Sequence, residues 1–252
     1  MNIGTLWKNI RFGCFMYWDL RTIQKYKRAI RRYKKTGQRE EEREEIRLME
    51  TTWGRHLIEK TGACIRVEGR EHIPAGPMVI VANHQSHTDI AILTYALCNT
   101  PFGFVAKEEL KKLPLFGHLI SDVRSVFIRR GDLRESLRTI EEGIELLKQG
   151  FSLGIFPEGT RSQGPQMGEF KKGSLRLAVK SGAPVLPITI SGSYRCFEEP
   201  GTPVGATVDV YIHPVIETAG MGRREAADLA VTVEGQIRQK LLELQQAEAQ
   251  QS

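Results

Sequence analysis

The chain has 252 residues, of which 40% are hydrophobic and 26% are charged, and its formal net charge is +6. This composition is ordinary for a soluble globular domain, and it excludes collagen-like, low-complexity and polytopic membrane proteins. The four cysteines lie far apart in the chain and form neither a CxxC pair nor a Cys/His cluster at zinc spacing. We therefore expect reduced thiols, no structural metal and a cytosolic chain.

The positive charge is concentrated in the first 39 residues, which hold eleven Lys and Arg residues and a single acidic residue, Asp19. The remainder of the chain carries a slight negative excess. The same segment is rich in aromatic residues, among them Trp7, Phe12, Phe15, Tyr17, Trp18 and Tyr26. A basic, aromatic segment favours an anionic partner, either a membrane surface or a nucleic acid.

Residues 3–20 are predicted to form a helix about 27 Å long, close to the thickness of a bilayer core. Lys8, Arg11 and Asp19 interrupt this stretch, so we expect neither a membrane span nor a secretory signal. An interfacial helix fits better, because Trp and Tyr favour the headgroup level and basic side chains attract anionic lipid. The alternative is that the aromatic residues pack on the rest of the protein. Nucleic-acid binding is disfavoured because no nucleic-acid motif accompanies the basic run.

Thr36 and Gly37 indicate a helix break, and a second helix is expected from about residue 39 to residue 60, ended by Gly62. We therefore assign residues 1–62 to a basic and aromatic helical pair that associates with a membrane. Residues 63–252 are assigned to a catalytic α/β domain.

Strand and helix patterns alternate in this second part of the chain. Strands are expected at 65–67, 78–82, 102–106, 123–128, 151–156, 185–190 and 207–212. Helices are expected at 89–97, 107–112, 132–150, 172–180 and 223–246. This alternation predicts a single α/β domain with a central, largely parallel or mixed sheet flanked by helices and preceded by the N-terminal helical pair.

In such sheets, ligands bind beyond the carboxyl ends of the strands, and polar motifs occur at these positions. The first motif runs from Asn83 to Asp89, directly after a buried strand, and contains His84. A carboxylate five residues after an imidazole is placed to bond one ring nitrogen and leave the other free as a base. The alternative is an Asp89 that only caps a helix and a His84 that is satisfied in the core.

A second motif, Phe156-Pro157-Glu158-Gly159-Thr160-Arg161-Ser162, follows another strand. Arg161 offers a fork that matches a phosphate or carboxylate, and glycine permits close backbone approach. The alternative is an ordinary turn with a surface arginine. Two further blocks are Phe127-Ile128-Arg129-Arg130 and the apolar strand Val185-Leu186-Pro187-Ile188.

Together these blocks resemble the glycerolipid acyltransferase family, and within it the bacterial 1-acyl-sn-glycerol-3-phosphate acyltransferases. Asn83-His84-x-Ser86-x-x-Asp89 matches the NHxSxxD block, and residues 156–162 match FPEGTRS without a change. Residues 107–117 and 170–173 resemble the KxEL…P…G and FKxG stretches of the family. One departure is Arg124, which stands where the family usually has glycine in the loop that helps define the acceptor pocket.

The resemblance implies acyl transfer from acyl-CoA or acyl carrier protein to the sn-2 hydroxyl of 1-acyl-sn-glycerol-3-phosphate, which gives phosphatidic acid. By the same resemblance, His84 is the general base and Asp89 orients it. Arg130 and Arg161 match phosphate-binding positions, and Lys107 is expected as a third phosphate ligand. Glu158, Gly159 and Thr160 form the loop expected to serve the oxyanion and the acceptor, with Glu158 ordering the loop or touching the glycerol. His87 is expected to be a bystander.

The resemblance implies no metal and no cofactor, because the thioester donor is already activated. It also implies that the basic segment binds the membrane surface, since acceptor and product are lipids of the cytoplasmic leaflet. We therefore expect a peripheral or monotopic protein on the cytoplasmic side of the cell membrane, with no nucleic-acid partner.

Three other functions stay open. One is acylation of another lysolipid, such as lyso-ornithine lipid or a lysophospholipid, although Arg124, Arg129 and Arg130 favour an anionic acceptor. A hydrolase is a second alternative, but no GxSxG nucleophile elbow is present. A third is a non-catalytic membrane-surface binding protein that uses only the basic segment.

Overall fold

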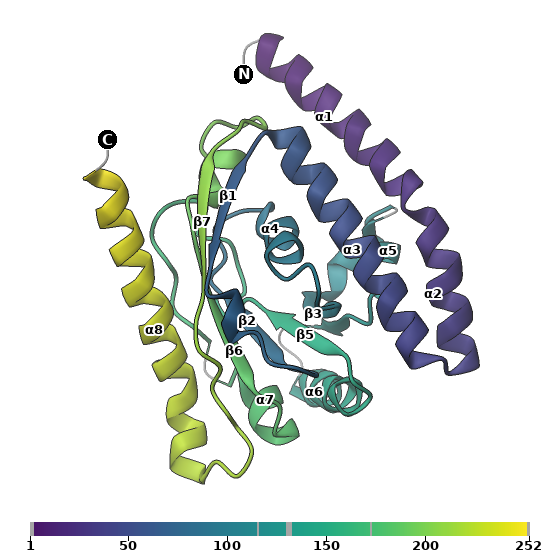
Figure 1. The fold of residues 1–252 in the computed structure, drawn as a ribbon, viewed down its shortest axis with the longest axis vertical. Coiled ribbons are helices and arrows are strands. Elements are labelled where there is room, and N and C mark those ends of the chain that lie inside the picture. The colour runs from purple at the N-terminus through teal and green to yellow at the C-terminus, as the bar shows by residue number, and fades with distance from the viewer. Residues whose placement is uncertain (1–2, 115, 130–132, 172, 251–252) are drawn as a thin grey trace.

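The computed structural model describes residues 3–250 except 115, 130–132 and 172. Its centre is a seven-stranded sheet in the order β1-β7-β6-β2-β5-β3-β4 (Figure 1). The strands of the described chain are β1 (Cys64–Glu68), β2 (Val79–Ala82), β3 (Phe102–Lys107), β4 (Val126–Ile128), β5 (Ser152–Ile155), β6 (Val185–Ser191) and β7 (Thr207–Ile212). Neighbouring strands pair in parallel, apart from the antiparallel pair β6 and β7. The predicted fold class, an α/β domain with a largely parallel or mixed sheet, is confirmed.

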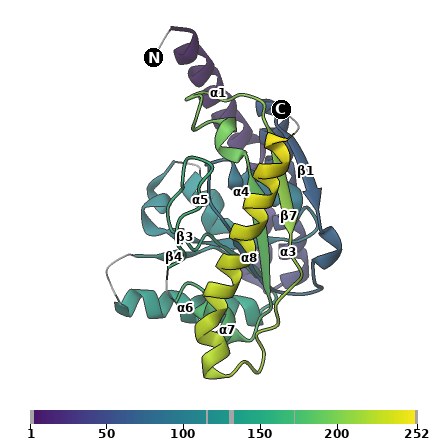
Figure 2. The same cartoon turned by 90° about the vertical axis from the view of Figure 1, so that its left-hand side faces the viewer.

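Helices cover both faces of the sheet. The α-helices are α1 (Ile3–Thr22), α2 (Gln24–Thr36), α3 (Arg39–Thr61), α4 (Asp89–Ala96), α5 (Phe116–Asp122), α6 (Leu133–Lys148), α7 (Arg176–Ser181) and α8 (Arg223–Ala249). Side chains of β2 alternate between two clusters: Val79 and Val81 join residues of α7 and α8, whereas Ile80 and Ala82 join residues of α4. Figure 2 shows α8 running along one side of the sheet, with α6 and α7 near its lower end.

The N-terminal helices form a bent layer against this body. α1 and α2 meet at Ile23, and the chain then turns back into α3 (Figure 1). Ile23 and Ile30 are buried in the same cluster as residues of the sheet. Lys27 and Arg31 of α2 pair with Asp122 of α5 at 3.6 and 2.9 Å.

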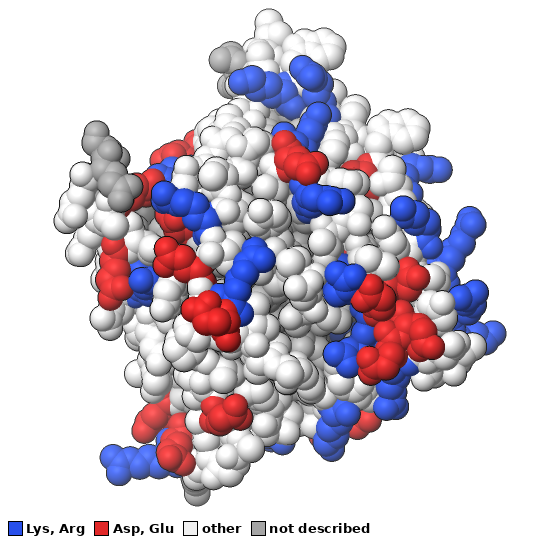
Figure 3. All heavy atoms as spheres, viewed as in Figure 1, with Lys and Arg blue, Asp and Glu red and all other residues white. Residues whose placement is uncertain are grey.

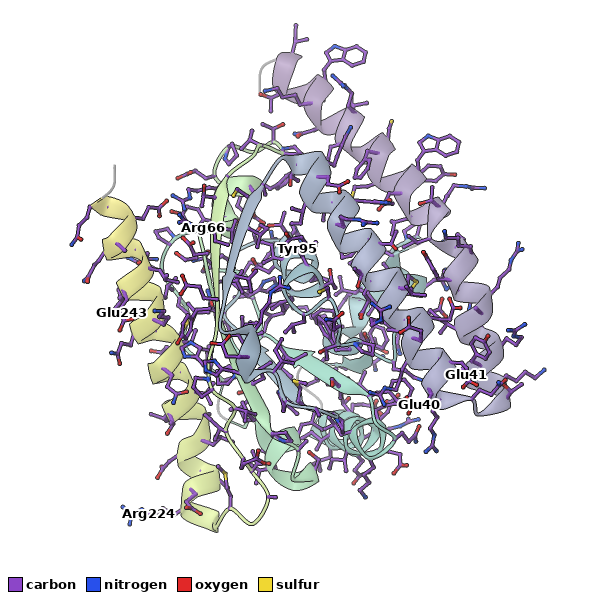
Figure 4. All side chains as sticks on the ribbon, viewed as in Figure 1. Glu40, Glu41, Arg66, Tyr95, Arg224 and Glu243 are labelled. Atoms are coloured by element: carbon purple, nitrogen blue, oxygen red, sulfur yellow. The ribbon has the colours of Figure 1, made fainter. Side chains whose placement is uncertain are left out.

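The start of α3 carries acidic residues. Glu40 and Glu41 lie on its first turn and project outward at the α2–α3 corner (Figure 4). Carboxylates at this position complement the positive end of the helix dipole. None of the described helices is both long and apolar enough to cross a bilayer.

The structure corrects several element boundaries. The strand expected at 123–128 covers only Val126–Ile128, because residues 123–125 form the turn that follows the unpredicted helix α5. Arg124, with φ of 61°, separates α5 from β4. The helix expected at 107–112 is a 3₁₀ helix, η2 (Glu108–Lys112), and the helix expected from residue 172 begins at Arg176. Two further 3₁₀ helices were not predicted, η1 (Arg70–His72) and η3 (Ser193–Cys196). Asp132, the first residue of the helix expected at 132–150, lies outside the described residues.

Candidate active site

The two principal motifs meet beyond the carboxyl ends of β2 and β5, which are neighbours in the sheet. The loop after β5 pairs with the loop after β2: Ser162 N donates to His84 O at 2.8 Å, and Gln163 N donates to Gln85 O at 3.2 Å. These two loops, more than 70 residues apart in the sequence, therefore lie side by side and form one wall of the candidate site.

His84 and Asp89 are in direct contact on this wall. His84 Nδ1 lies 2.7 Å from Asp89 Oδ2, and the Asp89 side chain is completely buried. The same oxygen accepts hydrogen bonds from the backbone N–H groups of Gln85 at 2.7 Å and Ser86 at 2.8 Å. These donors fix the carboxylate, so it holds the imidazole with Nδ1 inward and leaves Nε2 for a substrate.

Two further contacts fix the position of this loop. The His84 ring stacks on Phe156, with 4.0 Å between ring centroids and 16° between planes. The Asn83 side chain both donates to and accepts from the backbone of Ile190 on β6, at 2.8 Å each. The loop is therefore fixed to β6 and its imidazole is restricted to one plane.

Glu158 lies behind the wall rather than on it. Its Oε1 accepts from the backbone N–H of His84 at 2.6 Å, and its Oε2 accepts from Gly168 N at 2.7 Å. Burial raises the pKa of the Glu158 carboxyl, against the opposing effect of these two backbone bonds. In this geometry the side chain ties the His84 loop to the 168 loop.

Gly159 has a positive φ of 68°, and its N–H donates to Phe156 O at 2.9 Å. That N–H is thus already engaged in a turn. Thr160 is the next residue on the loop, and both residues line the cavity described below.

Arg161 lies on the same wall, 2.8 Å from Glu198 (Nη1 to Oε1). The Arg161 side chain is 26% exposed, whereas the Glu198 side chain is 4% exposed. His87 N donates to the same Glu198 oxygen at 2.8 Å. Desolvation, and then the nearby charge of Arg161, lower the pKa of His87.

The remaining predicted cations are placed differently from one another. Lys107, at the end of β3, lines the cavity. Arg129 is exposed and pairs with Glu108 at 2.7 Å. Arg130 lies outside the described residues. Arg124 is not among the residues that line the cavity and pairs with buried Glu42 at 2.6 Å, which gives no support to the expectation that it favours an anionic acceptor.

A cavity of about 910 Å³ opens at this wall, within the usual range for small-molecule sites. His84, Lys107 and Arg161 are among its polar lining residues. Its apolar walls include Phe12 and Met16 of α1, Trp53 and Leu57 of α3, and Leu119 and Ile120 of α5. The cavity therefore combines polar, cationic lining residues with extensive apolar walls.

Sequence reasoning missed Glu198 and Glu42, which are the partners of Arg161 and Arg124. Neither glutamate belongs to a motif, and each lies far along the chain from its arginine. The stacking partner of His84, Phe156, was inside a motif, but its contact with the imidazole had no sequence signal.

Comparison with known proteins shows the family to which the chain belongs. The family model described as Acyltransferase matches residues 64–191. The chain is 31% identical to the 1-acyl-sn-glycerol-3-phosphate acyltransferase of Borreliella burgdorferi, over 71% of this chain and 72% of the relative. It is 32% identical to the enzyme of the same name from Pseudomonas aeruginosa, over 80% of each chain. The crystal structure of the 1-acyl-sn-glycerophosphate acyltransferase PlsC from Thermotoga maritima superposes with a TM-score of 0.68 at 34% identity, covering 84% of this chain and 83% of that one.

Proposed function

This chain belongs to the acyltransferase family, and we propose that it transfers an acyl chain from a thioester to the sn-2 hydroxyl of 1-acyl-sn-glycerol-3-phosphate. The product is phosphatidic acid, a phospholipid precursor. The observation that carries the proposal is the 2.7 Å contact between Asp89 and His84, which lines the apolar cavity together with Arg161. The relatives named above carry the same activity in their names.

In the proposed reaction, His84 Nε2 accepts the proton of the sn-2 hydroxyl as its oxygen attacks the thioester carbonyl carbon. Asp89 keeps the tautomer correct and stabilises the imidazolium that forms. The tetrahedral intermediate then collapses, the carbon–sulfur bond breaks, and the thiolate leaving group takes the proton from the imidazolium. Positioned general-base catalysis of this kind contributes roughly 10²–10⁴-fold to the rate.

The oxyanion of that intermediate needs hydrogen-bond donors. Because the Gly159 N–H is engaged with Phe156 O, we assign this role to the N–H of Thr160. Gly159 supplies the left-handed backbone that presents the loop, and Glu158 holds the loop against His84.

The acceptor's phosphate is assigned to Arg161 and Lys107, which both lie on the cavity wall. Charge-assisted contacts from a guanidinium fork are the strong kind. Arg130 is assigned to the same phosphate on its motif position alone. The acyl chain is assigned to the apolar interior of the cavity, and the donor to acyl-CoA or acyl carrier protein.

The protein is proposed to work on the cytoplasmic surface of the membrane through α1. Exposed large apolar side chains gather on this helix: Ile3, Leu6, Trp7, Ile10, Tyr17 and Trp18. In Figure 3, basic side chains lie near this end of the molecule and along the edge formed by α1 and α2. Phe12 and Met16 of the same helix line the cavity, so a lipid tail would enter beside the membrane-facing helix.

The test is acyl transfer to radiolabelled 1-acylglycerol-3-phosphate in mixed micelles, with acyl-CoA and acyl carrier protein thioesters as donors. Wild type and His84→Ala are compared, and His118→Ala serves as control because His118 is an exposed histidine. Other lysolipids are included as competing acceptors. We expect wild type and His118→Ala to form phosphatidic acid and His84→Ala to lose at least about 100-fold in rate.

Product formed only from another lysolipid would keep the chemistry and change the acceptor. No transfer to any acceptor by folded protein would overturn the enzyme proposal and favour a membrane-surface binding protein.

A further inference from the structure

We propose that Glu198 is a positioning residue that orients Arg161 for the phosphate of the acceptor, an inference that rests on the proposed function. Glu198 belongs to the loop after η3 and lies 37 residues from Arg161 in the sequence. It does not line the cavity itself, whereas Arg161 does, so it reaches a substrate only through the groups that it holds.

The carboxylate is held on two sides. Glu198 Oε1 accepts from Arg161 Nη1 and from the backbone N–H of His87, each at 2.8 Å. Because His87 lies inside the loop that carries His84, this oxygen ties the phosphate-binding side chain to the catalytic loop. An arginine fork with one N–H fixed in this way keeps its other donors free for a ligand.

The loop that carries Glu198 is itself anchored. Glu199 N donates to Tyr194 O at 3.1 Å, and Gly201 N donates to Phe197 O at 2.9 Å. Asn9 of α1 donates from Nδ2 to Gly201 O at 3.0 Å. Glu198 is therefore presented from a fixed turn and is not a mobile surface acid.

The contact between Glu198 and Arg161 is not one that stabilises the fold well. The Glu198 side chain is 4% exposed, and its Oε2 is buried and accepts no hydrogen bond from the described residues. Leaving a carboxylate oxygen buried and unsatisfied costs free energy. A residue retained only to stabilise the fold would be better satisfied, so the geometry points to the orientation of Arg161.

The experiment measures initial rates and thermal unfolding for wild type, Glu198→Ala, Glu198→Gln and Arg161→Ala. Glu199→Ala is the matched control, because it removes the same charge from the neighbouring, exposed residue. Acceptors are 1-acylglycerol-3-phosphate and the phosphate-free 1-acylglycerol, with one thioester donor.

For Glu198→Ala we expect the KM for 1-acylglycerol-3-phosphate to rise about tenfold, the loss of one charge-assisted contact. The kcat, the donor KM and the KM for 1-acylglycerol should stay within about twofold of wild type. Glu198→Gln keeps an oxygen acceptor and should restore most of the acceptor KM. In the Arg161→Ala background, Glu198→Ala should add nothing further.

Three results for Glu198→Ala would overturn the positioning role: a fall in kcat, an equal rise in the KM for the phosphate-free acceptor, or a further rise in KM when it is combined with Arg161→Ala. So would a similar effect from Glu199→Ala. If Glu198→Ala does not fold, Glu198→Asp takes its place. Its shorter carboxylate should raise the KM for 1-acylglycerol-3-phosphate, and an unchanged KM would overturn the positioning role. If the wild-type protein transfers to no acceptor, the proposed function itself is wrong, and this result is distinct from a failure of the positioning role.

Discussion

Arg124 and Glu42 form a two-pronged ion pair, with 2.6 Å from Nε to Oε1 and 2.7 Å from Nη2 to Oε2. The Glu42 side chain has no solvent exposure, and the Arg124 guanidinium also lies 4.9 Å from the ring centroid of Phe151. Arg124 adopts a left-handed backbone with φ of 61°. A position where glycine would be unstrained thus carries an arginine that anchors α3 to the turn before β4.

The first prediction concerns this anchor. Arg124→Ala should lower the free energy of unfolding by about 3–5 kcal/mol, because Glu42 then stays buried without its counter-charge. Arg124→Gly should be more stable than Arg124→Ala by about 1 kcal/mol, since glycine adopts the left-handed conformation without strain. Urea unfolding followed by circular dichroism measures both values.

Combining Glu42→Gln with Arg124→Gly should cost less than the sum of the two single changes. Strictly additive losses, or glycine and alanine variants of equal stability, would contradict this account.

The second prediction concerns His84 and Asp89, the proposed catalytic pair. Asp89→Asn keeps the side-chain volume, but its amide cannot accept from Gln85 N, Ser86 N and the imidazole in the way the carboxylate does. We expect kcat to fall at least about 100-fold with the acceptor KM nearly unchanged, because the loss lies in the proton transfer. Steady-state kinetics with 1-acylglycerol-3-phosphate check this, and a folded Asp89→Asn variant with near-normal kcat would remove Asp89 from the mechanism.

The third prediction is a pH dependence of stability that comes from Glu50. This carboxyl lies on the wall of the apolar cavity and accepts one hydrogen bond, from Phe102 N at 3.2 Å. Burial raises its pKa well above the ordinary value of 4.5. At a pH between the ordinary pKa of the unfolded chain and the raised pKa of the folded protein, Glu50 is protonated only in the folded protein. The free energy of unfolding therefore falls as pH rises through this range, by at most about 1.4 kcal/mol per pH unit.

Glu50→Gln removes this dependence while it keeps an oxygen for Phe102 N. The free energy of unfolding of the variant should equal that of wild type near pH 4 and should be larger than that of wild type at pH 7 to 8. Glu41→Gln is the control, because Glu41 is an exposed acid on the same helix. A Glu50→Gln variant that is less stable than wild type at pH 8 would refute the assignment.

The fourth prediction concerns the exposed aromatic residues of α1, the helix proposed to contact the membrane. Trp7 and Trp18 are 62% and 65% exposed. Replacing both by alanine should weaken binding to vesicles that contain anionic lipid by at least about tenfold, because each ring buries apolar surface at the headgroup level. Sedimentation with vesicles measures this, and Leu242→Ala on α8 is the control, since Leu242 is also exposed, at 53%. Equal losses from both variants would remove α1 from the interface.

Much of the candidate site was predictable from local patterns. His84 and Asp89 are five residues apart, so their contact depends on one turn and the start of one helix. The motifs at 83–89 and 156–162 each follow a buried apolar run. Both motifs were expected beyond the carboxyl ends of strands, where ligands bind, and the structure places them there on the neighbouring strands β2 and β5.

Other features were decided by tertiary structure alone. The short helix α5 has too few turns for a clear period, and the antiparallel pairing of β6 with β7 depends on how the chain returns across the sheet. Arg161 and Arg124 are equally charged in the sequence, yet Arg161 lines the cavity and pairs with Glu198, whereas Arg124 pairs with Glu42, 82 residues away. Ion pairs of such separation leave no periodic trace in the chain, because only burial in the folded protein determines which counter-charge each arginine meets.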